Sequence, residues 1–204
     1  MTALGLGAVS LVPLYLAALA LGSGLAAEAA GRPVWLLGRS AARGSALGYR
    51  LAFALAVLGP LLQTAWPALH GADPLWREAG GPLGGVAGLL VAVAGALLAV
   101  AGQAAMGASW RVGVRDDAVG ALVTEGPFRV SRNPVFAGQA LLLAGVALAV
   151  PSLPGVLAAL LFAGAAAAQV RAEERALAAR HGAGYQAYRA RVPRWIGPTG
   201  RGAA

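Results

Sequence analysis

Long stretches without a charged residue dominate the pattern of hydrophobic and polar positions along this chain. Such charge-free windows cover residues 2–27, 51–69, 79–110 and 133–170. Each window holds at least one helix of about 20 residues, the length needed to cross the hydrocarbon of a bilayer. The pattern therefore predicts several transmembrane helices.

The last window is long enough for two helices, because it has 38 residues with the sequence PSLP at 151–154 in its middle. Proline removes a backbone donor and disfavours helix in the residue before it. We therefore expect a hairpin of two helices, both short for a full crossing. The five expected spans are Ala3–Ala27, Ala46–Leu69, Leu83–Ala105, Val135–Val150 and Gly155–Gln169.

Composition agrees with this pattern. Hydrophobic residues make up 58% of the 204 residues and charged residues only 12%, against roughly 25% charged residues in soluble proteins. The expected fold class is an all-α polytopic membrane helix bundle, with a C-terminal helical hairpin followed by a cytoplasmic helix. The chain has no cysteine and only two histidines, so no metal site is expected.

The arginines predict an orientation. All 16 basic residues are arginines, and all except Arg77 fall on one side of the five expected spans. By the positive-inside rule that side is cytoplasmic, which leaves the N terminus outside a plasma (inner) membrane. The net charge of +8 is then topological, and we expect no nucleic-acid partner.

A polar segment precedes the hairpin and reads GPFRVSRNP over residues 126–134. Asn133 before Pro134 predicts a helix that starts at Pro134 with Asn133 as its cap. Free backbone donors and Arg132 then gather at a positive helix end, which suits a carboxylate or a phosphate. The alternative is an ordinary interfacial loop with arginines that reach toward the headgroups.

A second polar segment begins where the fifth span ends, with Glu173 and Glu174. Two adjacent carboxylates can accept hydrogen bonds from vicinal hydroxyls or balance a cation. Ionisable groups at a membrane margin usually face protein or a wet cavity, because exposure to lipid is costly. The alternative is that Arg171 and Glu174, spaced i and i+3, pair on a solvated face.

The tail after HGAG (181–184), where we expect the helix to end, carries Tyr185, Tyr188 and Arg191. A spacing of three puts the two tyrosines on one helix face. The tail is expected to lie at headgroup level, where the alternative to a role in a binding site is anchoring by aromatic residues and arginine.

These motifs together resemble the isoprenylcysteine carboxyl methyltransferase and phospholipid methyltransferase superfamily of integral membrane enzymes. The motifs are GPFRVSRNPVFAG, the proline-broken hairpin and EExxLxxxxGxxYxxYxxRVP, and they cover roughly Gly107 to Pro198. We therefore divide the chain into the N-terminal helices, residues 1–106, and a methyltransferase-like region, residues 107–204.

The resemblance implies S-adenosyl-L-methionine bound at the cytosolic margin and a lipophilic acceptor that enters from the bilayer among the membrane lipids. Carried over by position, the arginine-histidine-proline-x-tyrosine-x-glycine motif, the double glutamate and the closing motif give these candidates: Arg132, Asn133, Pro134, Phe136 and Gly138; Glu173 and Glu174; Tyr185, Tyr188 and Arg191.

The chain departs from the family pattern at Asn133, where histidine is usual, and at Phe136, where tyrosine is usual. Asparagine still donates and accepts hydrogen bonds but cannot titrate. A prenylcysteine enzyme is also expected to place a basic residue in the preceding helix, where this chain offers only Gln103, with Arg111 at its end. The match to prenylcysteine enzymes in particular is therefore the weaker one.

The expected reaction is methyl transfer, which requires that the two reacting groups be held in line. Glu173 and Glu174 are expected to bind hydroxyl or amino groups of the cofactor, and Arg132 with the helix start at Pro134 its carboxylate. Arg111 or Arg191 is the candidate catalytic residue that orients the acceptor head. The alternatives are an NADPH-dependent membrane reductase of the sterol-reductase type, although no GxGxxG is present, and a non-catalytic scaffold.

Overall fold

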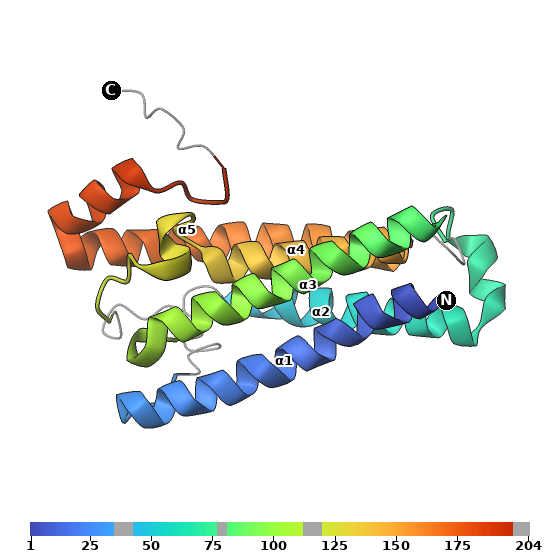
Figure 1. Ribbon diagram of the computed structural model, residues 1–204, viewed down its shortest axis with the longest axis horizontal. Coiled ribbons are helices and arrows are strands. Elements are labelled where there is room, and N and C mark those ends of the chain that lie inside the picture. Colours follow the sequence, from blue (N-terminus) through green and yellow to red (C-terminus); the bar gives the residue numbers. More distant parts are fainter. Residues whose placement is uncertain (35–42, 77–80, 112–119, 198–204) are drawn as a thin grey trace.

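The computed structural model describes residues 1–34, 43–76, 81–111 and 120–197, and its regular elements there are all helices. The α-helices are α1 (Ala3–Ala30), α2 (Arg43–Ala65), α3 (Gly81–Met106), α4 (Pro134–Ala149) and α5 (Leu153–Arg191). Three 3₁₀ helices lie between them: η1 (Pro67–Ala72), η2 (Gly107–Ser109) and η4 (Gly126–Arg129). The long helices run side by side as one bundle (Figure 1), so the expected all-α class is confirmed.

Four of the helices, α1, α2, α3 and α5, are long and apolar enough to cross a membrane, and α4 is a shorter apolar helix. Within the bundle α3 packs along α4, α2 packs along α5, and α1 packs against α3. The helices alternate in direction, so the chain crosses from one end of the bundle to the other with each of them (Figure 1). The expected spans therefore correspond to real helices, and the chain is a membrane protein.

The hairpin breaks where the prolines predict, between Ala149 and Leu153. Ser152 caps the new helix, because its Oγ accepts a hydrogen bond from the Gly155 N–H at 3.2 Å. Proline in the first turn is compatible with a helix start, since its missing N–H would have no partner there.

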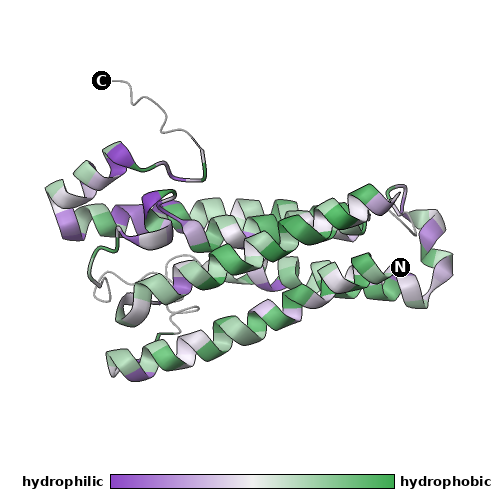
Figure 2. Cartoon of the chain, viewed as in Figure 1, coloured by the Kyte–Doolittle hydropathy of each residue, from purple (hydrophilic) through white to green (hydrophobic). Residues whose placement is uncertain are grey.

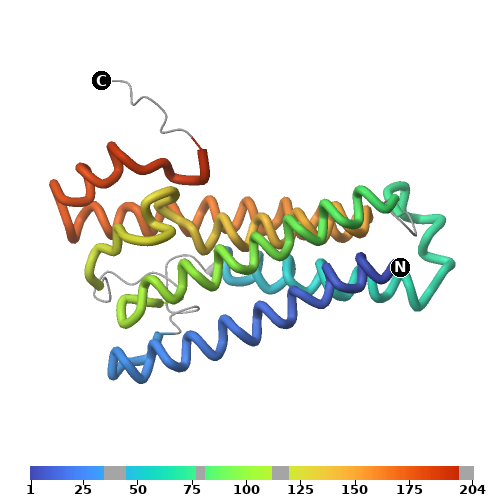
Figure 3. Tube along the Cα trace, viewed as in Figure 1, coloured from blue at the N-terminus to red at the C-terminus, as the bar shows by residue number. Residues whose placement is uncertain are grey.

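α5 continues beyond the fifth expected span as far as Arg191, and its regular helical backbone is interrupted at Gly182, inside the HGAG segment where the helix is expected to end. The segment after Val170 is charged, but alanine, leucine, glutamate and arginine are all strong helix formers, so the helix passes out of the apolar window without ending. Its direction changes at Gly182, where φ is +49° and ψ is −123°. The last part, red in Figure 3, turns back from the rest of α5.

A seam of glycines joins α3 to α4 at backbone contact. A Cβ added at Gly95 would lie 2.4 Å from the Leu142 nitrogen, and one at Gly145 would lie 2.4 Å from the Ala92 nitrogen. Gly88 and Gly138 have equally close backbone neighbours across the same contact. We call these four residues the glycine seam. Small residues permit such close approach in lipid, where van der Waals packing drives helix association.

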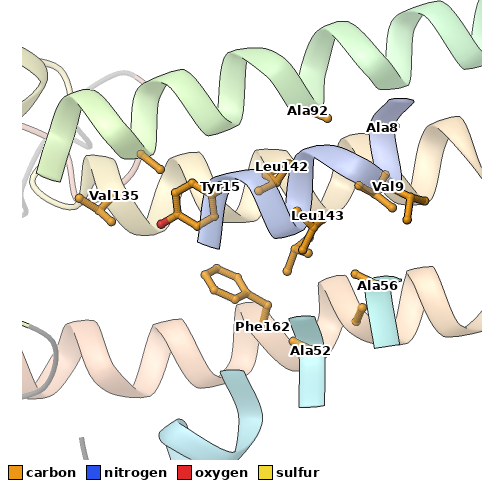
Figure 4. Packing of buried hydrophobic residues seen from close by; sticks show 14 of the residues in the cluster. Ala8, Val9, Tyr15, Ala52, Ala56, Ala92, Val135, Leu142, Leu143 and Phe162 are labelled. Atoms are coloured by element: carbon orange, nitrogen blue, oxygen red, sulfur yellow. The ribbon is translucent and has the colours of Figure 1, made fainter. Parts of the chain in front are cut away.

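Side chains from α1, α2, α4 and α5 fill the middle of the bundle. Figure 4 shows Leu142 and Leu143 of α4 beside Tyr15 of α1, with Phe162 of α5 below them in this view, and all four belong to one buried cluster. Phe162 is fully buried and lies against the ring of Phe53, with 5.8 Å between the ring centroids. Figure 2 shows many hydrophilic residues at one end, around η4 and the last part of α5, and a smaller hydrophilic part at the other end, around η1. We call the end around η4 and the last part of α5 the polar end.

At the opposite end of the bundle, the buried carboxylate of Asp73 connects two helices. One oxygen accepts hydrogen bonds from the Gln63 amide and from the Leu153 N–H, at 2.8 Å for the latter, so Asp73 links α2 to the first residue of α5. Burial alone would raise the pKa of Asp73, but these hydrogen bonds and those from nearby backbone N–H groups outweigh it and hold the pKa below its usual value.

The glycine seam predicts that Gly145→Ala lowers thermal stability, because the added methyl group meets backbone atoms that cannot move aside. Overpacking of this kind costs about 1–3 kcal/mol. Gly164→Ala in α5 is the matched control, since its Cβ would meet no atom within 4 Å and alanine is the better helix former. Thermal unfolding in detergent should show a lower Tm for the first variant and an equal or higher Tm for the second. Equal Tm values for both variants would contradict the proposed role of the seam.

Asp73 predicts a loss of stability in acid. A carboxylate whose folded pKa is depressed stabilises the protein above the unfolded pKa of about 3.9, and the contribution disappears as the pH falls through the folded pKa. Tm measured from pH 7 to pH 3 should therefore fall more in the wild type than in Asp73→Asn, whose side chain does not titrate. Parallel curves for the two proteins would exclude this role.

Candidate functional site

A buried ion pair between Arg132 and Glu174 forms the centre of the polar end. Arg132 lies in the segment just before α4, and Glu174 lies on α5. The Arg132 Nη1 is 3.1 Å from the Glu174 Oε1, and these side chains are only 7% and 10% exposed. Buried charges are tolerated when they are paired and hydrogen-bonded. The structure therefore brings together two candidates that are 42 positions apart in the sequence.

A second arginine completes the pair, and the sequence analysis did not name it as a site residue. The Arg194 Nη2 is 2.7 Å from the Glu174 Oε2, and the Arg194 Nε is 3.1 Å from both carboxylate oxygens. This hydrogen bonding raises the pKa of Arg194. Glu174 pairs with Arg132 and Arg194 and not with Arg171 in the described part of the chain, so the alternative of a solvated pair between Arg171 and Glu174 is wrong.

Residues 192–194, which we call the C-terminal strap, lie along the segment before α4. The Arg132 N–H donates to the Pro193 carbonyl at 2.9 Å, and the Ser131 Oγ donates to the Arg194 carbonyl at 3.2 Å. The Asn133 Nδ2 also donates to the Arg194 carbonyl, at 3.1 Å. Three hydrogen bonds thus fasten the C-terminal strap to the segment just before α4.

Asn133 occupies the cap position of α4, as expected, but its side chain accepts no hydrogen bond from the helix. The reason is that its amide donates outward, to the C-terminal strap and, at 3.5 Å, to Glu174. Side-chain capping of α4 by Asn133 is therefore wrong, and the Asn133 N–H is itself satisfied by the Ser131 Oγ at 3.1 Å.

Tyr185 and Tyr188 face the protein, because the change of direction at Gly182 returns this part of α5 to the polar end. Both tyrosines are buried, and their rings meet edge to face with centroids 6.3 Å apart. The Tyr185 hydroxyl accepts a hydrogen bond from the Arg132 Nη1 at 3.1 Å, and the Tyr188 hydroxyl donates to the Phe128 carbonyl at 2.8 Å. The two tyrosines therefore line the candidate site and also pack the last part of α5 against the polar end.

A cavity of about 590 Å³ connects this polar end to the interior of the bundle. Its size lies within the range of pockets that bind cofactors or drug-sized ligands. Charged and polar residues line one part, and apolar residues of α1 and α2 line the other. The polar part includes Arg111, Arg132, Asn133, Glu173, Glu174, Tyr185 and Tyr188; the apolar part includes Pro13, Leu16, Leu19, Phe53, Ala54 and Val57.

Glu173 and Arg111 are both at this cavity and carry opposite charges. The Glu173 carboxylate accepts a hydrogen bond from the Gln169 Nε2 at 3.0 Å, and Gln169 in turn accepts one from Ser45 at 3.0 Å. Burial lowers the pKa of Arg111, and the negative charge of Glu173 opposes that shift. In the described part of the chain neither Glu173 nor Arg111 has an ion-pair partner within 4 Å.

Arg111 also has hydrogen-bonding capacity to spare. It is 8% exposed, and among the described residues its guanidinium makes only a 3.5 Å contact to the Ser109 carbonyl. The buried Nε atoms of Arg111 and of Arg132 have no partner there. Buried donors without a partner are uncommon in folded proteins, so these two point to groups that the site binds.

Two of the predicted site residues lie away from the cavity wall. Arg191 is exposed, and its Nε donates to the Ala187 carbonyl at 3.2 Å. Gly138 belongs to the glycine seam, where its backbone lies against Ala99 of α3. Pro134 and Phe136, in contrast, line the cavity, and Phe136 stacks on Tyr49 with 6.1 Å between ring centroids.

Several cavity residues were missed by reasoning from sequence. Arg194 directly follows the closing motif, which ends with Arg191, Val192 and Pro193, and nothing in its sequence position distinguished it from the other arginines of the tail. Tyr49, Gln139 and Gln169 are polar groups within expected spans, which is a signal that could have selected them. Trp110 is held by the 2.9 Å hydrogen bond from its Nε1 to Ser23, and only the packing of α1 on α3 reveals it.

In comparisons with known proteins, the family model described as phospholipid methyltransferase matches residues 83–183. The matched segment contains all but the first two residues of α3, the hairpin and α5 up to its change of direction, so it includes Arg111, Arg132, Glu173 and Glu174. No curated protein and no solved structure matches the chain in these comparisons.

The paired arginines predict that Glu174→Ala is strongly destabilising, because it leaves Arg132 buried without a counter-charge. Removal of one partner from a buried pair costs about 3–5 kcal/mol. Glu28→Ala, which removes an exposed carboxylate from the end of α1, is the control. Thermal unfolding in detergent should show a large drop in Tm for the first variant only. A similar small change in both would mean that Glu174 does not organise the polar end.

Proposed function

Because residues 83–183 are a phospholipid methyltransferase domain, within the superfamily of integral membrane methyltransferases, we propose that this protein transfers a methyl group from S-adenosyl-L-methionine to a lipophilic acceptor. The observation that carries the proposal is the single cavity shared by charged residues at the polar end and apolar residues inside the bundle. A small polar molecule and the reacting end of a lipid can meet in such a space.

The residues of the polar end fit S-adenosyl-L-methionine, which carries a carboxylate, an amino group and two ribose hydroxyls. The buried Nε of Arg132 has no described partner and lies next to the start of α4, where helix dipole and guanidinium both favour an anion. Glu173 offers carboxylate oxygens to amino or hydroxyl groups. Tyr185 and Tyr188 supply aromatic surface beside them.

Glu174 has a different task in this proposal from its neighbour Glu173. Its carboxylate already forms an ion pair with Arg132 and accepts hydrogen bonds from Arg194, so we assign it to holding Arg132 in place. Glu173, which has no arginine within 4 Å among the described residues, is then the carboxylate that contacts the cofactor.

The departure at Asn133 is consistent with this assignment. The Asn133 side chain donates to the C-terminal strap, a task that needs a donor but no titrating group. We therefore propose that this position closes the polar end and that no proton is transferred there. Phe136 likewise contributes a ring to the cavity wall without a hydroxyl.

The acceptor is proposed to lie in the apolar part of the cavity with its head near Arg111. When bound, the cofactor supplies a methyl group that is activated by its sulfonium, and the acceptor supplies the attacking lone pair. The protein has to hold the acceptor in line and exclude water, which is worth about 7–11 kcal/mol of a barrier when the geometry is right. Arg111, with its unpartnered Nε, is suited to orient an acidic or polar head.

We also propose that the polar end faces the cytoplasm of the plasma (inner) membrane. The support for this is the arginine distribution, since positively charged segments are retained on the cytoplasmic side. Arg191 is then a surface residue of that side, where it can contact anionic headgroups.

The decisive test is methyl incorporation from labelled S-adenosyl-L-methionine into membrane lipid or a prenylated thiol by the purified protein. We expect incorporation, and we expect S-adenosylhomocysteine to raise the Tm while NADPH does not. Stabilisation by NADPH without methyl transfer would instead support a reductase.

Substitutions of Arg111 and Glu173 should affect different properties, the rate of methyl transfer and the affinity for the cofactor. Arg111→Ala is expected to lower methyl transfer at least about tenfold with little effect on S-adenosylhomocysteine affinity, whereas Glu173→Gln should weaken that affinity about tenfold or more, the range for a hydrogen bond to a charged group. Arg175→Ala, an exposed arginine on α5, is the control for both. The assigned roles are wrong if Arg111→Ala weakens the binding of S-adenosylhomocysteine as much as Glu173→Gln does.

A further inference from the structure

Two polar side chains meet in the apolar interior of the bundle, away from the polar end. The Gln139 Nε2 of α4 donates to the Tyr15 hydroxyl of α1 at 2.6 Å, and the two residues are only 7% and 3% exposed. Figure 4 shows the Tyr15 ring among apolar side chains, with its hydroxyl oxygen on the side of the ring nearer Val135. Polar groups at such a depth are costly and usually serve a function.

The stability gained by joining α1 to α4 does not by itself explain why this hydrogen-bonded pair is present. Hydrogen bonds between membrane helices contribute little to stability on average. Moreover, a glutamine amide has two N–H donors and one carbonyl, and among the described residues Gln139 makes a single hydrogen bond. Gln139 also lines the cavity, so its remaining donor and acceptor are available to a bound molecule.

The surroundings of Gln139 restrict what that molecule offers. The neighbouring lining residues in this part are apolar or aromatic, among them Leu16, Phe53 and Val135. A full charge would be poorly solvated there, whereas a neutral group that accepts one hydrogen bond is well matched. The group must also be flanked by hydrocarbon on the side away from the polar end.

The position of Gln139 along α4 sets the depth of this group. Gln139 follows Asn133 by six residues, which corresponds to about 9 Å along a helix axis. A lipid whose head lies at the polar end carries its ester or amide linkage at a comparable distance from that head. The linkage, with hydrocarbon beyond it, therefore matches both the depth and the chemistry of Gln139.

We infer that Gln139 binds the carbonyl oxygen of an ester or amide linkage in the acceptor lipid, and that Tyr15 is the positioning residue that holds the Gln139 amide. This inference rests on the proposed function for the identity of the acceptor, but not for the binding itself. It makes Gln139 a specificity-determining residue that favours lipids with a carbonyl between head and chain.

The test compares two probes that differ only in the carbonyl group, 1-oleoylglycerol and its ether analogue 1-O-oleylglycerol. Their affinities are measured on the full-length protein in detergent micelles at matched mole fractions. We expect the wild type to bind the ester about tenfold more tightly, the usual effect of one hydrogen bond in an apolar site. Gln139→Leu should abolish the preference, and Tyr15→Phe should reduce it.

Gln186→Leu, which removes an exposed amide from the last part of α5, should keep the full preference. Equal affinity of the wild type for both probes, no binding of the ester, or an undiminished preference in Gln139→Leu would each overturn the inference. Tyr15→Phe provides a second variant if Gln139→Leu does not fold, and an undiminished preference in it would count against the positioning role.

The outcomes separate this inference from the proposed function. Methyl transfer by a protein that does not distinguish the two probes would leave the enzyme and remove the carbonyl site. Loss of the preference in Gln139→Leu, in a protein that neither binds S-adenosylhomocysteine nor transfers methyl groups, would leave a lipid site in a protein of another function.

Discussion

The shared use of one buried carboxylate by two arginines determines how the polar end is built. Glu174 lies on α5, Arg132 precedes α4 and Arg194 belongs to the C-terminal strap, so a single anion connects three segments that are distant in the sequence. A buried charge has to be compensated, and each of these segments therefore depends on the other two. The cavity wall at this end exists because the three are held together.

The rest of the bundle supports that arrangement through a different kind of contact. The glycine seam brings α3 and α4 together along their backbones, which fixes where α4 begins and hence where Arg132 and Asn133 lie. At the other end Asp73 fastens the first residue of α5 to α2. Packing contacts fix the positions of the helices, and polar contacts fix the positions of their ends. The cavity is enclosed by the segments that these two kinds of contact hold in place.

The helices could be predicted from the sequence because length and hydropathy alone decide whether a segment spans a bilayer, and the proline pair at 151–154 marks the hairpin unambiguously. The partners of Glu174 could not, because Arg171 is near in sequence, whereas Arg132 comes near only through the α4–α5 hairpin and Arg194 only after the chain turns back at Gly182. Motif positions identified the cavity residues Arg132, Glu173 and Glu174 and its two buried tyrosines. Gln139 remained hidden among apolar neighbours, since its meaning depends on which helix face meets the cavity.

The glycine seam also bears on how the proposed lipid acceptor would reach the interior. Helices in contact along their backbones have no side-chain layer between them that could rearrange, so α3 and α4 behave as a rigid wall. The cavity is bounded elsewhere by side chains of α1, α2 and α5, such as Leu16, Phe53 and Leu177, which can change rotamer. If the proposed acceptor enters from the bilayer, we expect it to pass these movable side chains first and to meet the fixed wall last.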